Sequence, residues 1–263
     1  FITISNITGQ NKLSFEDTMF VPESYYNGLN ENKKAKKDDI LYSVVGSFGK
    51  PVYVDFDKQM VFQRHIAILR PKRNVNARFI YYTMLNPQFY KLVAKLAIGC
   101  SQRTVTLDTL RNIEVNLPDK DIQDKMVGIL SLIDEKIDIN NNVNDNLSAM
   151  AYDIYMHNFF SKKPNAKLKD ILTEAEKSAI QVGEAKTSNG EYPFFTSGAT
   201  ILKWNEPFVD GRNCFLNTGG NADVKFYVGK AAYSTDTWSV SAKSEMSDYL
   251  YLMLFSIKPE LDQ

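Results

Sequence analysis

The sequence LRNIEVNLPDKDIQDKMVGILSLIDEKI, residues 110–137, carries the pattern from which we infer the fold of this chain of 263 residues. A strand-like apolar run ends at Leu117-Pro118, and the acidic residues that follow can cap the start of a helix. From there to Ile154, apolar residues recur at steps close to four and three, which indicates one apolar stripe on a long helix. The stripe comprises Ile122, Met126, Ile129, Ile133, Ile137, Val143, Leu147, Met150 and Ile154.

Residues 119–160 are therefore predicted to form a helical spacer. At about 1.5 Å per residue a helix of about 38 residues would extend on the order of 57 Å, too long for one small domain to bury, so its stripe needs a partner. The Asn-rich run over residues 140–146 is the weak point, because Asn favours turns and caps over helix interiors. Two interpretations stay open: a break into two helices near Asn146, and a continuous helix in which a buried Asn140 sets the register of a coiled coil.

The regions on either side of the spacer, residues 1–118 and 161–263, contain short strand-like runs, turns and apolar helical periodicity. They match in the same order of elements at an offset of 170 to 175 residues, which indicates a duplicated domain. The matched segments are residues 40–43 with 214–217, 50–54 with 224–228, 66–68 with 238–240, and 79–82 with 249–252. We expect an α+β fold with two mixed α/β domains in tandem repeat, separated by a long coiled-coil-forming spacer helix.

The overlay also predicts that both domains are incomplete. The first copy has no counterpart of Lys167-Leu168-Lys169-Asp170-Ile171, so its N-terminal part would be missing. The second copy stops at Gln263, short of counterparts to residues 99–118 and to the spacer, so its C-terminal part and a second spacer helix would be missing.

The composition fits a globular protein, with 44% hydrophobic and 24% charged residues and no apolar run of about 18 residues that could span a membrane. The two cysteines, Cys100 and Cys214, lie far apart, which favours a reducing compartment and a cytoplasmic location. With only His65 and His157 and no spacing typical of metal ligands, we expect no bound metal.

Charge is distributed unevenly, although 31 basic residues balance 31 acidic ones overall. The net charge is +6 for residues 1–118 and −3 for each of residues 119–163 and 164–263. The basic clusters of the first region suit either solvated loops or contacts to phosphates, and residues 102–104 suit either base contacts or a polar capping loop. The candidate nucleic-acid contacts here are Lys33, Lys34, Lys36, Ser47, Lys50, Arg64, His65, Gln102, Arg103 and Thr104.

The second region offers a loop rich in Gly and Asn over residues 217–225. Such a loop lets backbone amides approach a phosphate or a base closely, or it is simply a long hairpin. Trp238 closes a polar turn and fits the core better than a base-stacking platform. The candidates here are Asn217, Thr218, Asn221, Lys225, Thr235 and Trp238.

Motifs typical of catalysis are absent from the sequence. It contains no phosphate-binding loop, no nucleophile elbow and no adenine-clamping motif of amino-methyltransferases, and His65 beside Arg64 fits a structural or ligand-contacting role better than a general base. We therefore expect no catalytic residue and no enzyme activity of the chain itself.

Residues 110–118 and 122–137 resemble the junction found in the specificity subunit of Type I restriction-modification systems. In that family a target-recognition domain ends in an apolar strand and Leu-Pro, then enters a spacer helix with Gln-x-x-Ile and Leu-Asp-x-x-Ile elements. Here Gln123-Asp124-Lys125-Met126 and Ile133-Asp134-Glu135-Lys136-Ile137 occupy those places, and Ile122 replaces a usual Glu. Residues 40–49 and 167–171 also look like family elements.

The resemblance implies a DNA-binding subunit without catalysis of its own. Each domain would read one half of a split double-stranded DNA target, while the spacer helices would pack antiparallel and dock two methyltransferase subunits. Those partners and the restriction subunits would bind S-adenosylmethionine, ATP and Mg, and this chain would bind no cofactor and no membrane. Two alternatives stay open: the recognition region of a fused restriction-methylation enzyme, and a β-rich carbohydrate-binding protein.

Overall fold

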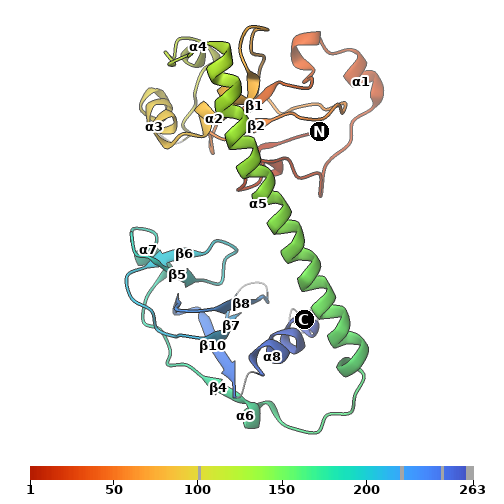
Figure 1. Ribbon diagram of the computed structural model, residues 1–263, viewed down its shortest axis with the longest axis vertical. Coiled ribbons are helices and arrows are strands. Elements are labelled where there is room, and N and C mark those ends of the chain that lie inside the picture. The colour runs from red at the N-terminus through yellow and green to blue at the C-terminus, as the bar shows by residue number, and fades with distance from the viewer. Residues whose placement is uncertain (100–101, 220–221, 244–245, 259–263) are drawn as a thin grey trace. The chain divides into compact units, whose positions relative to one another are not determined.

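The computed structural model describes residues 1–99, 102–219, 222–243 and 246–258 (Figure 1). It divides into two compact units, Phe1–Asp138 (unit 1) and Ile139–Gln263 (unit 2). Helix α5, Lys120–Tyr155, begins in unit 1 and ends in unit 2, where it continues as the π-helix Met156–Phe160. The predicted long helix is confirmed and the break near Asn146 is wrong. Each exposed Asn costs a helix only a few tenths of a kcal/mol, which the surrounding turns outweigh.

Unit 1 is built on a three-stranded antiparallel sheet of order β2-β1-β3. Its elements before α5 are η1 (Ile4–Asn6), α1 (Glu23–Asn27), η2 (Glu31–Lys33), β1 (Ile40–Ser43), β2 (Pro51–Tyr53), β3 (Ile66–Leu69), α2 (Ala77–Leu85), α3 (Pro87–Leu96) and α4 (Leu107–Arg111). Helices α2 and α3 are separated at Asn86. The side chain of Asn86 accepts a hydrogen bond from Gln88 N at 2.8 Å, and Pro87 occupies the first turn of α3.

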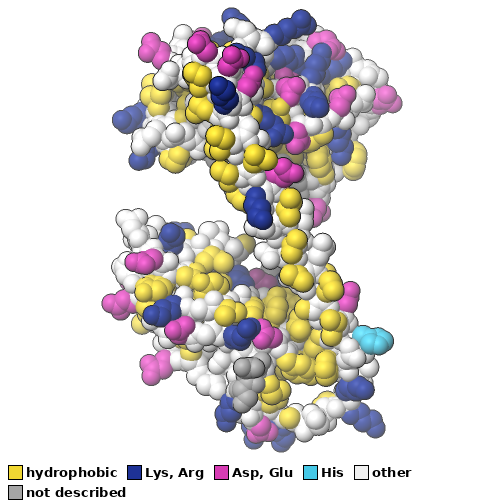
Figure 2. All heavy atoms as spheres, viewed as in Figure 1, with side chains coloured by type: hydrophobic (Ala, Val, Ile, Leu, Met, Phe, Trp, Pro, Cys, Tyr) yellow, Lys and Arg dark blue, Asp and Glu magenta, His cyan; other side chains and the backbone are white. Residues whose placement is uncertain are grey.

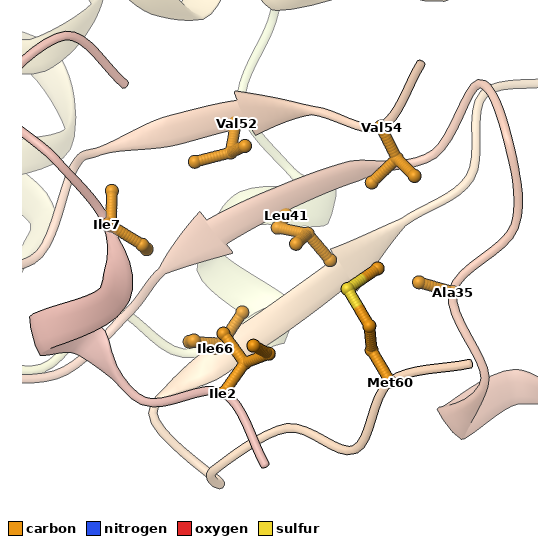
Figure 3. Close-up of a cluster of buried hydrophobic side chains, with 8 residues drawn as sticks. All are labelled: Ile2, Ile7, Ala35, Leu41, Val52, Val54, Met60 and Ile66. Atoms are coloured by element: carbon orange, nitrogen blue, oxygen red, sulfur yellow. The ribbon is translucent and has the colours of Figure 1, made fainter. Parts of the chain in front are cut away.

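Side chains from both faces of this sheet are buried. Leu41 packs with Ile2, Val52 and Ile66 in one cluster, which also receives Ile7, Ala35, Val54 and Met60 (Figure 3). Its neighbours Ile40 and Tyr42 point to the other face and pack with Met84 of α2. Successive side chains of a strand alternate between its two faces. Because both faces of β1 are covered, all four of its residues are buried, and the strand shows no alternation of apolar and polar residues.

Unit 2 contains two sheets, of order β4-β10-β7-β8 and β6-β5-β9. Its elements after the π-helix are α6 (Leu168–Ile171), β4 (Leu172–Glu174), α7 (Val182–Ala185), β5 (Tyr192–Phe195), β6 (Leu202–Trp204), β7 (Arg212–Asn217), β8 (Val224–Val228), β9 (Ala232–Tyr233), β10 (Thr237–Ala242) and α8 (Ser247–Ser256). Helix α8 covers one face of the larger sheet, where Leu250 and Leu254 pack on Cys214 and Val240. The observed α+β class agrees with the sequence-based expectation.

The two units share an arrangement of four elements. Strand β7 lies between β8 and β10, as β1 lies between β2 and β3, and all four pairs are antiparallel. Helix α8 follows β10 as α2 follows β3. The domain limits at residues 118 and 160 stay predictions, because the division into compact units falls inside α5.

The register of the strands corrects the sequence overlay by one residue on each flanking strand. Pro51 faces Tyr42, and Val224 faces Leu216, so Pro51 corresponds to Val224 where the overlay paired it with Lys225. In the same way Ile66 corresponds to Thr237, not to Trp238. The β7–β8 connection is one residue shorter than the β1–β2 connection, which shifts the later strand matches by one residue.

Candidate nucleic-acid interface

The β1–β2 hairpin of unit 1 is organised by a buried serine. Ser43, at the end of β1, donates its hydroxyl to Ser47 O at 2.9 Å and accepts from Lys50 N at 2.9 Å. Gly49 has φ near +90°, and a Cβ there would lie 2.6 Å from the ring of Tyr90, so glycine is required. The hairpin therefore holds Ser47 and Lys50 in a defined loop.

Two further segments are hydrogen-bonded to this hairpin. Val44 N donates to His65 O at 2.8 Å, which joins the turn before β3. Gly46 N donates to Arg103 O at 3.0 Å, which joins the loop before α4. The structure thus brings together, at one end of the sheet, the candidates Ser47, Lys50, Arg64, His65, Gln102, Arg103 and Thr104.

Arg103 is anchored within this end of unit 1. Its guanidinium lies 5.5 Å from the ring centre of Phe48 and donates to the carbonyl oxygen of Ala94 in α3. Phe48 in turn stacks on Tyr90, with ring centres 5.9 Å apart. Sequence reasoning missed Phe48 and Tyr90, since a single aromatic residue in a loop and one on a helix give no periodic signal. Arg103 keeps further donors for a ligand.

The candidates Lys33, Lys34 and Lys36 lie at the opposite end of the same sheet. Arg70, just beyond β3, donates to both carboxylate oxygens of the buried Asp39 at 2.7 and 2.8 Å and to Lys34 O at 3.0 Å. Lys34 and Lys36 each pair with Glu31 at 3.0 Å, and these bonds lower the pKa of Glu31. The structure does not bring Lys33, Lys34 and Lys36 together with the hairpin, so their role as nucleic-acid contacts stays a prediction.

In unit 2 the corresponding end of the sheet is formed by Asn217, Thr218, Thr235 and their neighbours. The side chain of Asn217 donates to Ser197 O at 2.9 Å, and Lys225 Nζ lies within 3.5 Å of Thr196 O, Asn217 Oδ1 and Asp223 Oδ2. Lys225 therefore links two loops of the unit. Asn221, the remaining candidate of this loop, lies outside the described residues.

Asp223 connects the same loop to the end of the chain. Partial burial raises its pKa, but the hydrogen bond from Lys258 at 2.9 Å and the charges of Lys258 and Lys225 outweigh that effect and lower the pKa below its ordinary value. Sequence reasoning missed Lys258, because it is 35 residues away from Asp223.

Trp238 is 49% exposed, so its expected place in the core is wrong. It precedes Val240 by two residues on the same face of β10, and the hydrophobic cluster under α8 includes Val240 but does not extend to Trp238. The indole is therefore available on the surface of unit 2, next to the turn that contains Thr235.

The same hydrogen bonds build this end of the sheet in both units. In unit 1, Gln63 N donates to Ile2 O, Ile66 N to Gln63 O, and Val44 N to His65 O, at 2.8 to 3.0 Å. In unit 2, Ser234 N donates to Phe195 O, Thr237 N to Ser234 O, and Thr218 N to Asp236 O, at 2.9 to 3.1 Å. The turns Gln63–Ile66 and Ser234–Thr237 are therefore structurally equivalent, and each is fixed to the hairpin beside it.

The apolar stripe of α5 is exposed along its whole length. Its nine residues, from Ile122 to Ile154, are 45% to 64% exposed, and hydrophobic side chains are visible along the surface of the helix (Figure 2). A contiguous exposed apolar surface of this extent is typical of an interface. The stripe has the exposure that the predicted partner-binding helix requires.

Unit 1 holds the first half of α5 through polar contacts. Gln123, only 2% exposed, donates its side-chain amide to Pro118 O at 2.7 Å and accepts from Asn76 N at 2.9 Å. Tyr82 of α2 donates to Asp134 at 2.7 Å, and burial, together with this bond, raises the pKa of the tyrosine. Lys12 pairs with Asp138.

Unit 2 holds the last turns of α5 through aromatic rings. Tyr249 of α8 meets Tyr155 and Phe159 edge to face at 5.4 and 5.3 Å, and Phe255 meets Tyr152 at 5.6 Å. Tyr155 is 5% exposed. These contacts lie on the side of the helix that α8 covers, so the stripe stays exposed.

Over the described ranges, no three His, Cys, Asp or Glu side chains gather in a group that could hold a metal ion. Within the same ranges no helix combines the length and hydrophobicity needed to span a membrane.

The model of the family described as "Type I restriction modification DNA specificity domain" matches residues 1–149, more than half of the chain. The chain belongs to this family. The resemblance inferred from residues 110–137 is thereby confirmed.

Specificity subunits are among its relatives. The chain is 28% identical over 167 residues to the specificity subunit of the Type I restriction enzyme HindI from Haemophilus influenzae, covering 59% of this chain and 36% of that subunit. It is 27% identical over 144 residues to the MjaVIII specificity subunit from Methanocaldococcus jannaschii, covering 52% and 33%. A crystal structure of a Type I system S subunit from M. genitalium matches with TM-score 0.46 and 17% identity, covering 86% of this chain and 65% of that one. The chain thus spans about a third of the length of the two specificity subunits.

Proposed function

We propose that the chain is the DNA-recognition part of a Type I specificity subunit, with each unit serving as a target-recognition domain for one half of a split target. The observation that carries this proposal is the repeated sheet end, where a hairpin and a turn are fixed by equivalent hydrogen bonds in both units. The loops of the two units are fixed in the same way but carry different side chains, which suits the recognition of two different DNA sequences.

The charge of unit 1 supports a nucleic-acid partner. Lys50, Arg64 and Arg103 lie on segments that converge at one end of the sheet, where they can contact phosphates or base edges. Among the described ion pairs, those of Lys34, Lys36 and Arg70 with acidic residues reduce the positive field at the other end. Phosphate contacts would position the duplex, and side chains of the loops would read it.

The exposed stripe of α5 supports a docking role. We infer that it packs against a second spacer helix of the complete subunit and against two methyltransferase subunits. The chemistry would belong to those partners and to restriction subunits, which would bind S-adenosylmethionine, ATP and Mg, while this chain would bind DNA in the cytoplasm and catalyse nothing.

Equilibrium binding of the chain to a random-sequence duplex tests the DNA partner. We expect affinity to fall linearly on a logarithmic scale as salt rises, because phosphate contacts release counterions. Arg103→Ala should weaken binding by about 1–3 kcal/mol. Absence of binding at low salt would contradict the proposal. Salt-independent binding to an oligosaccharide would favour the carbohydrate-binding alternative.

A further inference from the structure

The two equivalent turns carry opposite chemistry at their exposed positions. In the turn Gln63–Ile66 the exposed residue is Arg64, and in the turn Ser234–Thr237 it is Asp236. Arg64 offers only hydrogen-bond donors and Asp236 only acceptors. The backbone hydrogen bonds of the two turns match, but the exposed residue is the second of the turn in unit 1, where Arg64 corresponds to Thr235, and the third in unit 2, where Asp236 corresponds to His65.

Resting on the proposed function, we propose that these turns are the base-reading elements of the two units, with Arg64 contacting a guanine in one half-site and Asp236 a cytosine in the other. The guanidinium fork fits the O6 and N7 acceptors of guanine in the major groove, and a carboxylate accepts from the N4 amino group of cytosine. The turns thus set the chemical difference between the half-sites.

Each turn is rigid enough to discriminate between bases. The carbonyl oxygen of His65 is held by Val44 N, and that of Asp236 by Thr218 N, so neither turn can move without its hairpin. Arg64 also donates from Nε to His65 Nε2 at 3.4 Å, and Thr235 N donates to Ile180 O at 2.9 Å. A side chain on a fixed backbone loses little conformational freedom when it binds, and misplaced bases cannot be accommodated.

The negative charge of Asp236 supports a role in sequence specificity. An exposed carboxylate on a surface that approaches DNA repels phosphates whatever the sequence, so it weakens binding unless a base donates to it. A residue that repels most sequences and accepts from one base acts as a specificity determinant. Arg64 differs, because a guanidinium attracts phosphates as well as guanine.

Selection of a random-sequence duplex pool by the wild-type chain, followed by sequencing, gives the reference motif for the test. We expect Arg64→Ala to remove the preference for G·C at one position, about ten- to hundredfold, and to lower affinity for the whole pool. Asp236→Ala should remove the preference for one cytosine by a similar factor but raise affinity for the unselected pool. Each variant should leave the other half-site unchanged.

Matched controls are Arg73→Ala and Asp210→Ala, which remove the same exposed side chains beyond β3 and before β7, at the other ends of their strands. They should leave the motif unchanged. If the wild-type chain selects a motif that survives both Arg64→Ala and Asp236→Ala, or that the controls alter equally, the inference about the turns is wrong while the proposed function stands. If the wild-type chain binds no DNA, the proposed function itself fails, and the inference with it.

Discussion

The two ends of α5 are held in different ways by equivalent helices. In unit 1, α2 and its flanking loops fix the helix through directional polar bonds to Gln123, Asp124 and Asp134. In unit 2, α8 holds it through ring contacts of Tyr155 and Phe159 with Tyr249. The bonds of the buried Gln123 depend on one geometry, while those to Asp124 and Asp134 are exposed, and aromatic packing contributes buried area with weaker directional demands. The polar contacts in unit 1 therefore suit a fixed position of α5 along the unit. The aromatic contacts in unit 2 suit a larger contribution to the free energy of folding.

The largest effect is expected from removing a buried ring from the aromatic contacts in unit 2. Tyr155→Ala should destabilise unit 2 by about 3–4 kcal/mol, as is typical of truncating a buried aromatic side chain. Hydrogen exchange measured by mass spectrometry should show faster exchange in α8 and no change in α2. Phe160→Ala, at a half-exposed neighbour, should cost less than about 1 kcal/mol. Equal effects of the two variants would show that the aromatic contacts do not hold the helix.

A smaller loss of stability is expected when the side-chain hydrogen bonds of Gln123 are removed. Gln123→Leu leaves Asn76 N and Pro118 O without their partner, which should destabilise unit 1 by about 2–3 kcal/mol. Exchange should rise in α2 and stay unchanged in α8, the reverse of the pattern at Tyr155. The control Gln88→Leu changes an exposed glutamine and should shift the urea midpoint little. An unchanged urea midpoint for Gln123→Leu would show that the hydrogen bonds of Gln123 do not hold α5 in unit 1.

The smallest effect concerns a polar link in unit 2. The pKa of Asp223 is lowered, so its ion pairs with Lys258 and Lys225 stabilise the fold above the ordinary pKa of 3.8 and are lost as the pH falls through the lower folded value. Wild-type unit 2 should therefore lose more stability below pH 3.8 than the Asp223→Asn variant does. Urea unfolding at pH 7 and pH 3 measures this, with Asp210→Asn as the control. Parallel losses in the wild type and Asp223→Asn would mean that these pairs contribute nothing.

Local patterns in the sequence were sufficient to predict the main helix and the order of the strands. The stripe from Ile122 to Ile154 keeps one period over many turns, and a period of that length is hard to produce by chance. The register was not predictable to one residue. Strand β1 is buried on both faces, so it carries no alternation against which to align β7.

The candidate interface was predictable by residue type but not by geometry. Arg64 and Arg103 were found because they are basic residues in expected turns. The pairing of Arg70 with Asp39, 31 residues apart, and the contact of Lys225 with Thr196 depend on tertiary structure, which local spacing does not encode. For the same reason Trp238 was assigned to the core, since its exposure depends on where the cluster under α8 ends.

The claim that each unit reads its own half-site is tested by exchanging, in the complete subunit, the part of unit 1 that precedes α5. Residues 1–118 would be replaced by the matching region of another family member, and the subunit would be purified with its methyltransferase partners. We expect single-molecule sequencing of methylated DNA to show one half of the motif changed and the other half retained. A motif changed in both halves, or in neither, would contradict the claim that each unit reads its own half-site.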